Sequence, residues 1–121
     1  MKKSKWSRGI PMTVHELAER LALTPLAVGD ADREFSGVYI GDLLSWVMGR
    51  ASSDNVWITI MSNVNVIAVA TLADVACIIL AEGVTLDDGV RATAQMKGVN
   101  VYTSEKTAYE LAVLLSGLCG E

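Results

Sequence analysis

Apolar side chains recur at helical spacing near the start of this 121-residue chain. Thr13 and Glu16 lie at the beginning of this segment with the spacing of a capping box, in which each side chain bonds to the other residue's backbone amide. The pattern therefore predicts an amphipathic helix that begins after Thr13 and buries the stripe Val14, Leu17, Ala18 and Leu21.

Beyond this helix, short apolar runs alternate with segments that have helical spacing or helix caps. Turn-forming residues separate the runs, which predict strands over residues 26–28, 35–40, 56–60, 77–80 and 99–102. The run 77–80 is apolar throughout, as expected for a strand buried on both faces. Four further helices are predicted. They extend from Gly41 or Asp42 to Gly49, from Asn63 or Asn65 to about Ala76, from residues 85–88 to Lys97-Gly98, and from Thr103 or Ser104 to Gly117.

This alternation of strands and helices indicates crossover connections, and therefore a mainly parallel sheet flanked by helices. At this length the chain has room for one small α/β domain, which we expect over residues 12–121. Residues 1–11 lack apolar periodicity and carry the basic cluster of residues 2–8, so we expect a flexible N-terminal extension there.

A short run of charged, hydroxyl and glycine residues lies between an expected strand and an expected helix, where α/β domains commonly keep recognition residues. This run resembles the signature of the DRTGG domain family. Asp32 and Arg33 match the signature, Ser36 stands for its threonine, and Gly37 stands for its first glycine. Val38 occupies the position of the second glycine, which is a departure from the family pattern.

The resemblance covers the chain from residue 12 to about residue 118 and is most specific at residues 32–37, 41–45 and 56–59. It implies a small regulatory domain, of a kind that accompanies CBS domains or lies within larger enzymes as an accessory domain. The order of elements is also similar to the N-terminal domain of HPr kinase/phosphorylase and, more distantly, to that of the Mur ligases. No Gly-rich phosphate loop with a following Lys-Ser/Thr pair occurs in the sequence, so kinase chemistry is not carried over.

Two interpretations of the signature run stay open. Arg33 could present its planar guanidinium to a phosphate or carboxylate while Asp32 orients it. Alternatively, Asp32 and Arg33 could form an ion pair or a turn-stabilising contact that fixes the loop. Ser36 and Gly37 could let a ligand approach the backbone closely, or they could form a β-bulge.

A second group of polar residues follows the predicted strands. Thr59, Asn63 and Asn65 lie where a strand ends and a helix begins, a place where open α/β sheets commonly bind ligands. The alternative is that the asparagines only cap the helix. Glu82 and Ser104 end the two following strands and would border the same edge. Asp42, at the start of the second helix, completes this set of candidate binding residues.

Charge and composition exclude several classes of function. The formal net charge is −4 and the basic cluster is confined to residues 2–8, which argues against nucleic-acid binding by the folded domain. The longest apolar stretch, residues 64–81, is interrupted by Asp74, which argues against a membrane span. With only Cys77 and Cys119, we expect neither a disulfide framework nor a metal site, and a cytoplasmic location.

Side chains that could support catalysis are few. His15 falls off the apolar stripe of its helix, which predicts a solvated side chain, and Cys77 lies in an apolar run, which predicts a buried thiol. Trp46, Trp57 and Tyr109 are each expected in the core rather than at an interface.

We therefore predict a non-catalytic regulatory or sensory module that forms a homodimer and binds a small anionic or nucleotide-like ligand. A partner protein is a further expectation, because a free-standing regulatory domain must signal through another molecule or through its own assembly. The alternative is a protein-interaction or scaffold subunit without a ligand of its own. The sequence points to no cofactor.

Overall fold

A computed structural model describes residues 12–118 of the chain. They form a five-stranded sheet with the strand order β1-β5-β4-β3-β2. Its strands are β1 (Thr24–Ala27), β2 (Val38–Ile40), β3 (Val56–Thr59), β4 (Cys77–Leu80) and β5 (Val101–Thr103). The strands from β2 to β5 are parallel, whereas β1 pairs with β5 in the antiparallel direction. The predicted α/β fold with a mainly parallel sheet is thus confirmed.

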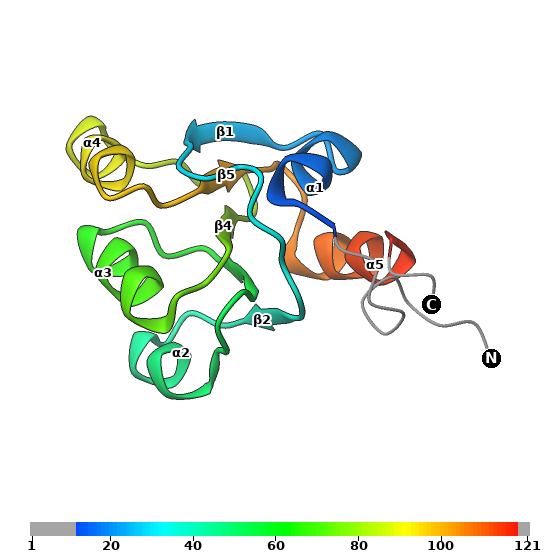
Figure 1. The fold of residues 1–121 in the computed structure, drawn as a ribbon, viewed down its shortest axis with the longest axis horizontal. Coiled ribbons are helices and arrows are strands. Elements are labelled where there is room, and N and C mark those ends of the chain that lie inside the picture. Colours follow the sequence, from blue (N-terminus) through cyan, green and yellow to red (C-terminus); the bar gives the residue numbers. More distant parts are fainter. Residues whose placement is uncertain (1–11, 119–121) are drawn as a thin grey trace.

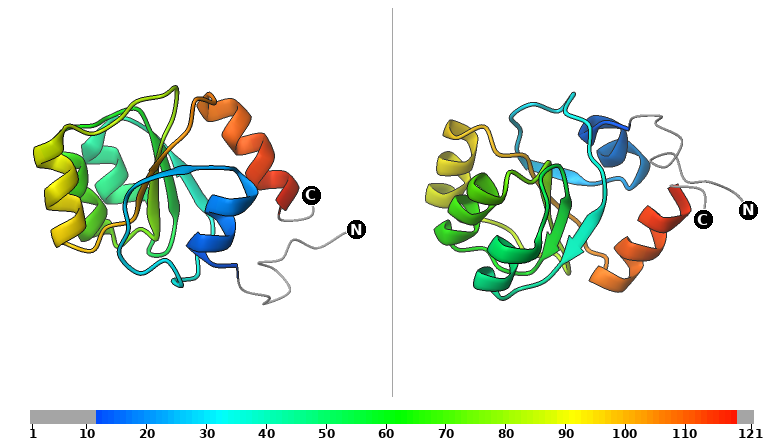
Figure 2. Two further views of the ribbon diagram at one scale, coloured as in Figure 1. Left: turned by 90° about the horizontal axis from the view of Figure 1, so that it is seen from above. Right: turned by 60° about the horizontal axis from the view of Figure 1, so that its bottom comes forward.

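Five helices cover the two faces of this sheet in three layers (Figures 1 and 2). Three helices pack on one face and two on the other, because the crossovers β2-α2-β3-α3-β4-α4-β5 all step in one direction along the sheet. The helices on the first face are α2 (Leu44–Arg50), α3 (Val64–Ala73) and α4 (Asp88–Met96), and those on the second are α1 (Val14–Arg20) and α5 (Ala108–Leu118).

Each face of the sheet carries its own apolar core. Ile58 and Ile79 lie beneath α1 and α5 together with Phe35, whereas Trp57 and Ile78 lie beneath α2, α3 and α4. All four residues of β3 and all four of β4 are buried, as the uninterrupted apolar run of β4 predicted. β3 and β4 are therefore covered on both faces.

The helix caps agree with the sequence at three helices. Thr13 and Glu16 form the predicted capping box of α1. Asn63 caps α3 by accepting a hydrogen bond from the amide of Asn65, and Asp87 caps α4 by accepting one from Val90. The capping interpretation of Asn63 is therefore confirmed.

Several predicted boundaries were wrong. Helix α5 begins after Thr107, not after Thr103 or Ser104, because Thr107 and Glu110 exchange the two bonds of a capping box. Gly49 and Gly117 lie inside α2 and α5 and do not end them. Helix α3 ends at Ala73 and not near Ala76, because Asp74 adopts the left-handed conformation (φ 59°) that turns the chain towards β4.

The strands also differ from prediction at their ends. β1 begins two residues earlier than expected and includes Pro25, which an edge strand tolerates since one side of it needs no amide donor. β5 begins at Val101, two residues later than expected; the side chain of Asn100, just before it, accepts from the amide of Gly29. Of the run 35–40, only Val38–Ile40 is a strand. The signature run is therefore a loop, and the predicted N-terminal extension, residues 1–11, lies outside the described residues.

No helix in the described part of the chain is long and apolar enough to cross a membrane.

Candidate functional site

The candidate binding residues divide between the two ends of the sheet. Asp32, Arg33, Ser36 and Gly37 precede β2 and lie at the end where the parallel strands begin. Asp42, Thr59, Asn63, Asn65, Glu82 and Ser104 follow β2, β3, β4 or β5 and lie at the opposite, carboxyl end. The sequence alone therefore predicted two separate sets of residues without revealing that the sheet separates them.

The first set belongs to a loop that we call the crossover loop, residues 28–37. It connects the two outermost strands, β1 and β2, and must therefore pass along the beginning of every other strand (Figure 1). Gln95 of α4 exchanges two hydrogen bonds with the backbone of Val28. Asn100 accepts from the amide of Gly29 at 2.7 Å and donates to the carbonyls of Asp30 and Ala76. Asn100 is buried, and these contacts satisfy its amide in a place where an unpaired group would be costly.

Arg33 makes the central contacts of the crossover loop. Its guanidinium donates to Asp54 Oδ1 from Nε at 3.1 Å and from Nη2 at 2.8 Å. Nη2 also donates to the backbone carbonyl of Asp74 at 2.6 Å and lies 3.1 Å from the Asp74 carboxylate. The acids that hold Arg33 are thus Asp54 and Asp74, and not Asp32, whose amide donates to Asp30. Arg33 joins the loop to the segments before β3 and β4.

These contacts shift two pKa values. Partial burial acts to lower the pKa of Arg33, but the hydrogen bond to Asp54 and the charge of Asp74 outweigh it and raise the pKa above its ordinary value. The pKa of Asp74 is lowered, chiefly by the hydrogen bond from the Ser53 hydroxyl at 2.7 Å and further by the charge of Arg33. Both charges are thus stabilised in the folded chain.

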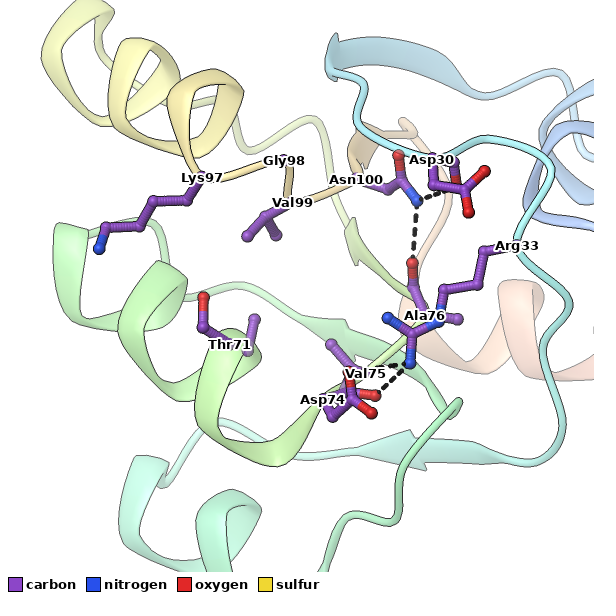
Figure 3. A pocket seen from close by; sticks show the side chains of 11 residues that line it. Asp30, Arg33, Thr71, Asp74, Val75, Ala76, Lys97, Gly98, Val99 and Asn100 are labelled. Carbon is purple, nitrogen blue, oxygen red and sulfur yellow. Dashed lines mark hydrogen bonds and ion pairs between the residues drawn. The ribbon is translucent and has the colours of Figure 1, made fainter.

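A small cavity of about 140 Å³ lies beside this ion-pair cluster (Figure 3). Arg33 and Asp74 line one side of it, Asp30 and Asn100 a second, and Lys97 extends from the end of α4 on the third. The carboxyl ends of α3 and α4 both reach the cavity, and helix carboxyl ends favour positive charge. The resident cation Arg33 already supplies that charge. This environment favours the structural interpretation of Arg33 over recognition of an anion.

Ser36 and Gly37 are also engaged by the scaffold. The Asn55 side chain donates to the carbonyl of Ser36, and the amide of Ser36 donates to the carbonyl of Asp54. Gly37 has φ +77°, and a Cβ there would lie 2.8 Å from the Asn55 amide nitrogen. A glycine is therefore required by the backbone and by Asn55. The structure records an irregularity of strand pairing in β1, between Pro25 and Ala27, and not at Ser36-Gly37.

At the carboxyl end, Asp42 and Thr59 form one connected group. The Thr59 hydroxyl, in a buried residue, donates to Asp42 Oδ1 at 2.7 Å, and the amide of Ile60 donates to the same oxygen at 3.0 Å. The hydroxyl of Thr59 also accepts from the amide of Met61. Asp42 thereby fastens the turn after β2 to the turn after β3.

Glu82 and Ser104 come together one strand further along the sheet. The amide of Glu82 donates to the carbonyl of Lys106, and the amide of Gly83 donates to the carbonyl of Ser104. Beside them lies a cavity of about 230 Å³ between the turn after β5 and the end of α1, which we call the carboxyl-end cavity. It is lined by Leu21, Ala22, Thr24, Thr103, Ser104, Glu105 and Lys106. Within residues 12–118, Lys106 forms no ion pair. Its charge acts on Glu110, whose pKa is lowered first by the hydrogen bond from the Thr107 amide and also by Lys106.

Sequence reasoning missed Asp54, Asp74 and Asn100, which hold the crossover loop. Asp54 lies among the turn-forming residues between two predicted elements, and Asp74 was interpreted only as an interruption of an apolar stretch. Both have positive φ, 69° and 59°, a conformation that Asp adopts more readily than most residues. An acid immediately before an apolar strand is thus a signal for such a turn, but its distant partner becomes known only from the topology.

Among the remaining single residues, the outcomes are mixed. His15 is exposed and lies 3.6 Å from Glu19, as predicted for a solvated side chain. Cys77 is buried, and burial raises the pKa of its thiol to about 12. Trp57 is in the core, where its indole donates to the carbonyl of Gly41. Trp46 and Tyr109 were wrongly expected in the core, since 51% and 77% of their surfaces are exposed. Arg50 covers the Trp46 ring at 3.7 Å.

Comparisons with known proteins bear on the fold. No family model matches the sequence, and no curated protein matches it. Among solved structures, the chain is similar to the CBS and DRTGG domains of the regulatory region of Clostridium perfringens pyrophosphatase, complexed with its activator diadenosine tetraphosphate. The TM-score is 0.73 at 14% sequence identity, over 88% of this chain and 47% of that one, so the chain spans about half the length of that structure. The DRTGG-like fold predicted from the sequence is confirmed.

Replacement of Arg33 tests its structural role. Arg33→Ala leaves Asp54 and the carbonyl of Asp74 without their donor, and we expect the free energy of unfolding to fall by about 2 kcal/mol. Arg33→Lys retains the charge but not the two-nitrogen contact with Asp54, so it should recover only part of that loss. Arg20→Ala, at an exposed helix position, is the control. Urea denaturation measures all three, and an unchanged stability of Arg33→Ala would contradict the structural role.

The lowered pKa of Asp74 predicts a pH dependence of stability. Because the folded-state pKa lies below the ordinary value, the stabilisation is present above about pH 4 and is lost as the pH falls through the lowered value. Ser53→Ala removes the largest cause of this shift, so the free energy of unfolding should fall less steeply with decreasing pH than in the parent. Denaturation at several pH values between about 2 and 6 measures the two slopes; equal slopes would refute the assignment.

Proposed function

We propose that this chain is a non-catalytic regulatory module that binds a small anionic, nucleotide-like ligand and forms a homodimer. The observation that carries the proposal is the likeness of fold to a regulatory region complexed with a nucleotide activator. The state of the nucleophile candidates supports it as well. The Cys77 thiol is buried and its pKa is raised to about 12, so it remains protonated at neutral pH. The free thiol also fits a cytoplasmic location.

Of the two ends of the sheet, the carboxyl end is the better place for an anion. At the other end, the donors of Arg33 are engaged by Asp54 and Asp74, and two helix carboxyl ends add negative potential. The carboxyl-end cavity instead offers the ammonium group of Lys106 and the hydroxyl of Ser104, with the carboxylate of Glu105 beside them. We therefore propose that these two residues contact the anionic part of the ligand.

Asp42, Thr59, Asn63, Asn65 and Glu82 border the same end of the sheet, but their described contacts are with neighbouring backbone and side chains. We propose that they shape the turns at this end of the sheet. A neutral or basic contact is what an anion requires, and the carboxylates of Asp42 and Glu82 do not offer one.

The surface favours a second candidate function, a protein-interaction subunit. Ile40, Leu43, Ile60 and Val64 are each about half exposed. Ile40 ends β2 and the other three follow β2 or β3 at the carboxyl end of the sheet. We call these four residues the apolar edge. β2 is also the outermost strand on this side, so one of its backbone edges is unpaired within the sheet. A second copy of the chain would cover this surface in the homodimer that we propose.

Ligand binding predicts a thermal shift. AMP, ATP, diadenosine tetraphosphate and inorganic phosphate are each tested against the parent, where free ligand a hundredfold above its dissociation constant stabilises the fold by about 2.7 kcal/mol. Lys106→Ala should reduce the shift with the phosphate-bearing ligands, whereas Lys97→Ala, an exposed lysine at the other end of the sheet, should not. If none of these compounds shifts the parent's melting temperature, the protein-interaction function is favoured.

The homodimer predicts a concentration-independent mass of two chains at tens of micromolar in sedimentation. Val64→Glu places a carboxylate within the apolar edge and should release monomers. The folded monomer should persist, because a negative charge at the first position of α3 suits the helix dipole. Leu72→Glu, at the other exposed end of the same helix, is the control and should remain dimeric. A monomeric parent would refute the dimer.

A further inference from the structure

A groove of about 380 Å³ lies between α1 and β1, on the face of the sheet that α1 and α5 cover. Small side chains make its walls, with Ala18 on α1 and Ala22 at the end of that helix. Pro25 of β1, Val28 of the crossover loop and Tyr102 of β5 also line it. Its volume falls within the range of pockets that hold small molecules, about 300–1,000 Å³.

Tyr102 is the observation that separates this groove from an ordinary surface hollow. Only 4% of its surface is exposed, yet its hydroxyl takes part in no hydrogen bond within the part of the chain that the structure describes. The pKa of Tyr102 is raised by burial and by the neighbouring Cys77 thiol, so the hydroxyl is protonated at neutral pH and can donate. Buried polar groups are nearly always paired, and this one lines an open groove.

Charge limits what the groove accepts. No lysine or arginine lines it, and its only titratable side chains besides Tyr102 are His15 and Glu19, which lie beside each other at 3.6 Å. An anionic group would lose its hydration there without gaining a counter-charge. A purely aliphatic molecule would leave the Tyr102 hydroxyl unpaired. The part of a ligand that fits is therefore uncharged, largely apolar, and equipped with a hydrogen-bond acceptor.

We propose that the groove between α1 and β1 binds the base of a nucleoside-type ligand, with the Tyr102 hydroxyl donating to a ring nitrogen or carbonyl of that base. This inference rests on the proposed function. It also agrees with the placement of the carboxyl-end cavity, because Ala22 lines both that cavity and the groove. A nucleotide can thus extend from the groove past Ala22 and bring its phosphate towards Lys106.

Two variants remove the site without removing the fold. Tyr102→Phe deletes a hydroxyl that has no partner in the free protein, so the melting temperature of the ligand-free variant should not fall. Ala18→Leu fills the groove from a helix position that accepts leucine readily. Tyr109→Phe and Ala68→Leu make the same two changes at exposed positions of α5 and α3 and serve as matched controls.

The test measures adenosine and AMP binding to the full chain by calorimetry, and maps amide shifts on adenosine addition by nuclear magnetic resonance. We expect Tyr102→Phe to weaken both ligands by about tenfold, Ala18→Leu to abolish binding, and both controls to bind like the parent. The adenosine-induced shifts should centre on Ala18, Ala22, Val28 and Tyr102.

The outcomes distinguish this inference from the proposed function. If AMP binds the parent and both groove variants with equal affinity, the groove assignment is overturned while the proposed function stands. If shifts on adenosine addition centre on another part of the domain, the same conclusion holds. If neither adenosine nor AMP binds the parent, the proposed ligand class and the groove assignment fail together.

Discussion

The contact of Arg33 with Asp54 and Asp74 holds the crossover loop against the end of the sheet where the parallel strands begin. The chain enters the sheet at one edge strand, β1, and must reach the opposite edge strand, β2, before the regular crossovers can start. A connection of this kind passes three strand beginnings, each with backbone groups that need partners. Arg33 donates to the Asp54 carboxylate before β3 and to the Asp74 carbonyl before β4, and Asn100, just before β5, bonds to the loop backbone. The resemblance to the DRTGG signature is thus carried, in this chain, by residues that fix topology.

Much of the fold could be predicted because its signals are local. The capping box at Thr13 and Glu16, the apolar run of β4 and the alternation of strands with helices each depend on residues that are close in the sequence. Predicted element boundaries were wrong where the local conformation depends on a contact between residues that are distant in the sequence. Phe35 was expected in a strand, but its amide donates to the carbonyl of Met12 and its side chain enters the core beneath α1 and α5. The chain there forms only an isolated bridge, between Glu34 and Thr13. Asp74 ends α3 early since its carbonyl accepts from Arg33, forty-one positions away.

The candidate site illustrates the same limit. Residue type alone identified Arg33 as an anion-binding candidate, and only the surrounding acids and helix ends show that its charge is already compensated. Ser104 was identified from its place after a strand, but Lys106 and the nearby cavity depend on how the end of α1 approaches that turn. Tyr102 gave no signal in the sequence, because a tyrosine in a strand is ordinary until its hydroxyl is found without a partner. A residue's position relative to a strand end can thus be predicted from the sequence. Whether its hydrogen-bonding groups already have partners in the fold cannot.

The crossover loop also holds the start of α1, because the first amides of that helix, those of Val14 and His15, donate to the carbonyls of Arg33 and Ala31 at 2.9 Å each. A helix that forms one wall of a groove is therefore tethered to the same segment that spans from one edge of the sheet to the other. Any displacement of α1 must either break these two bonds or pull the segment with it, and that segment holds the turns at Asp54 and Asp74. The position of α1 is thereby coupled through the crossover loop to the turns before β3 and β4.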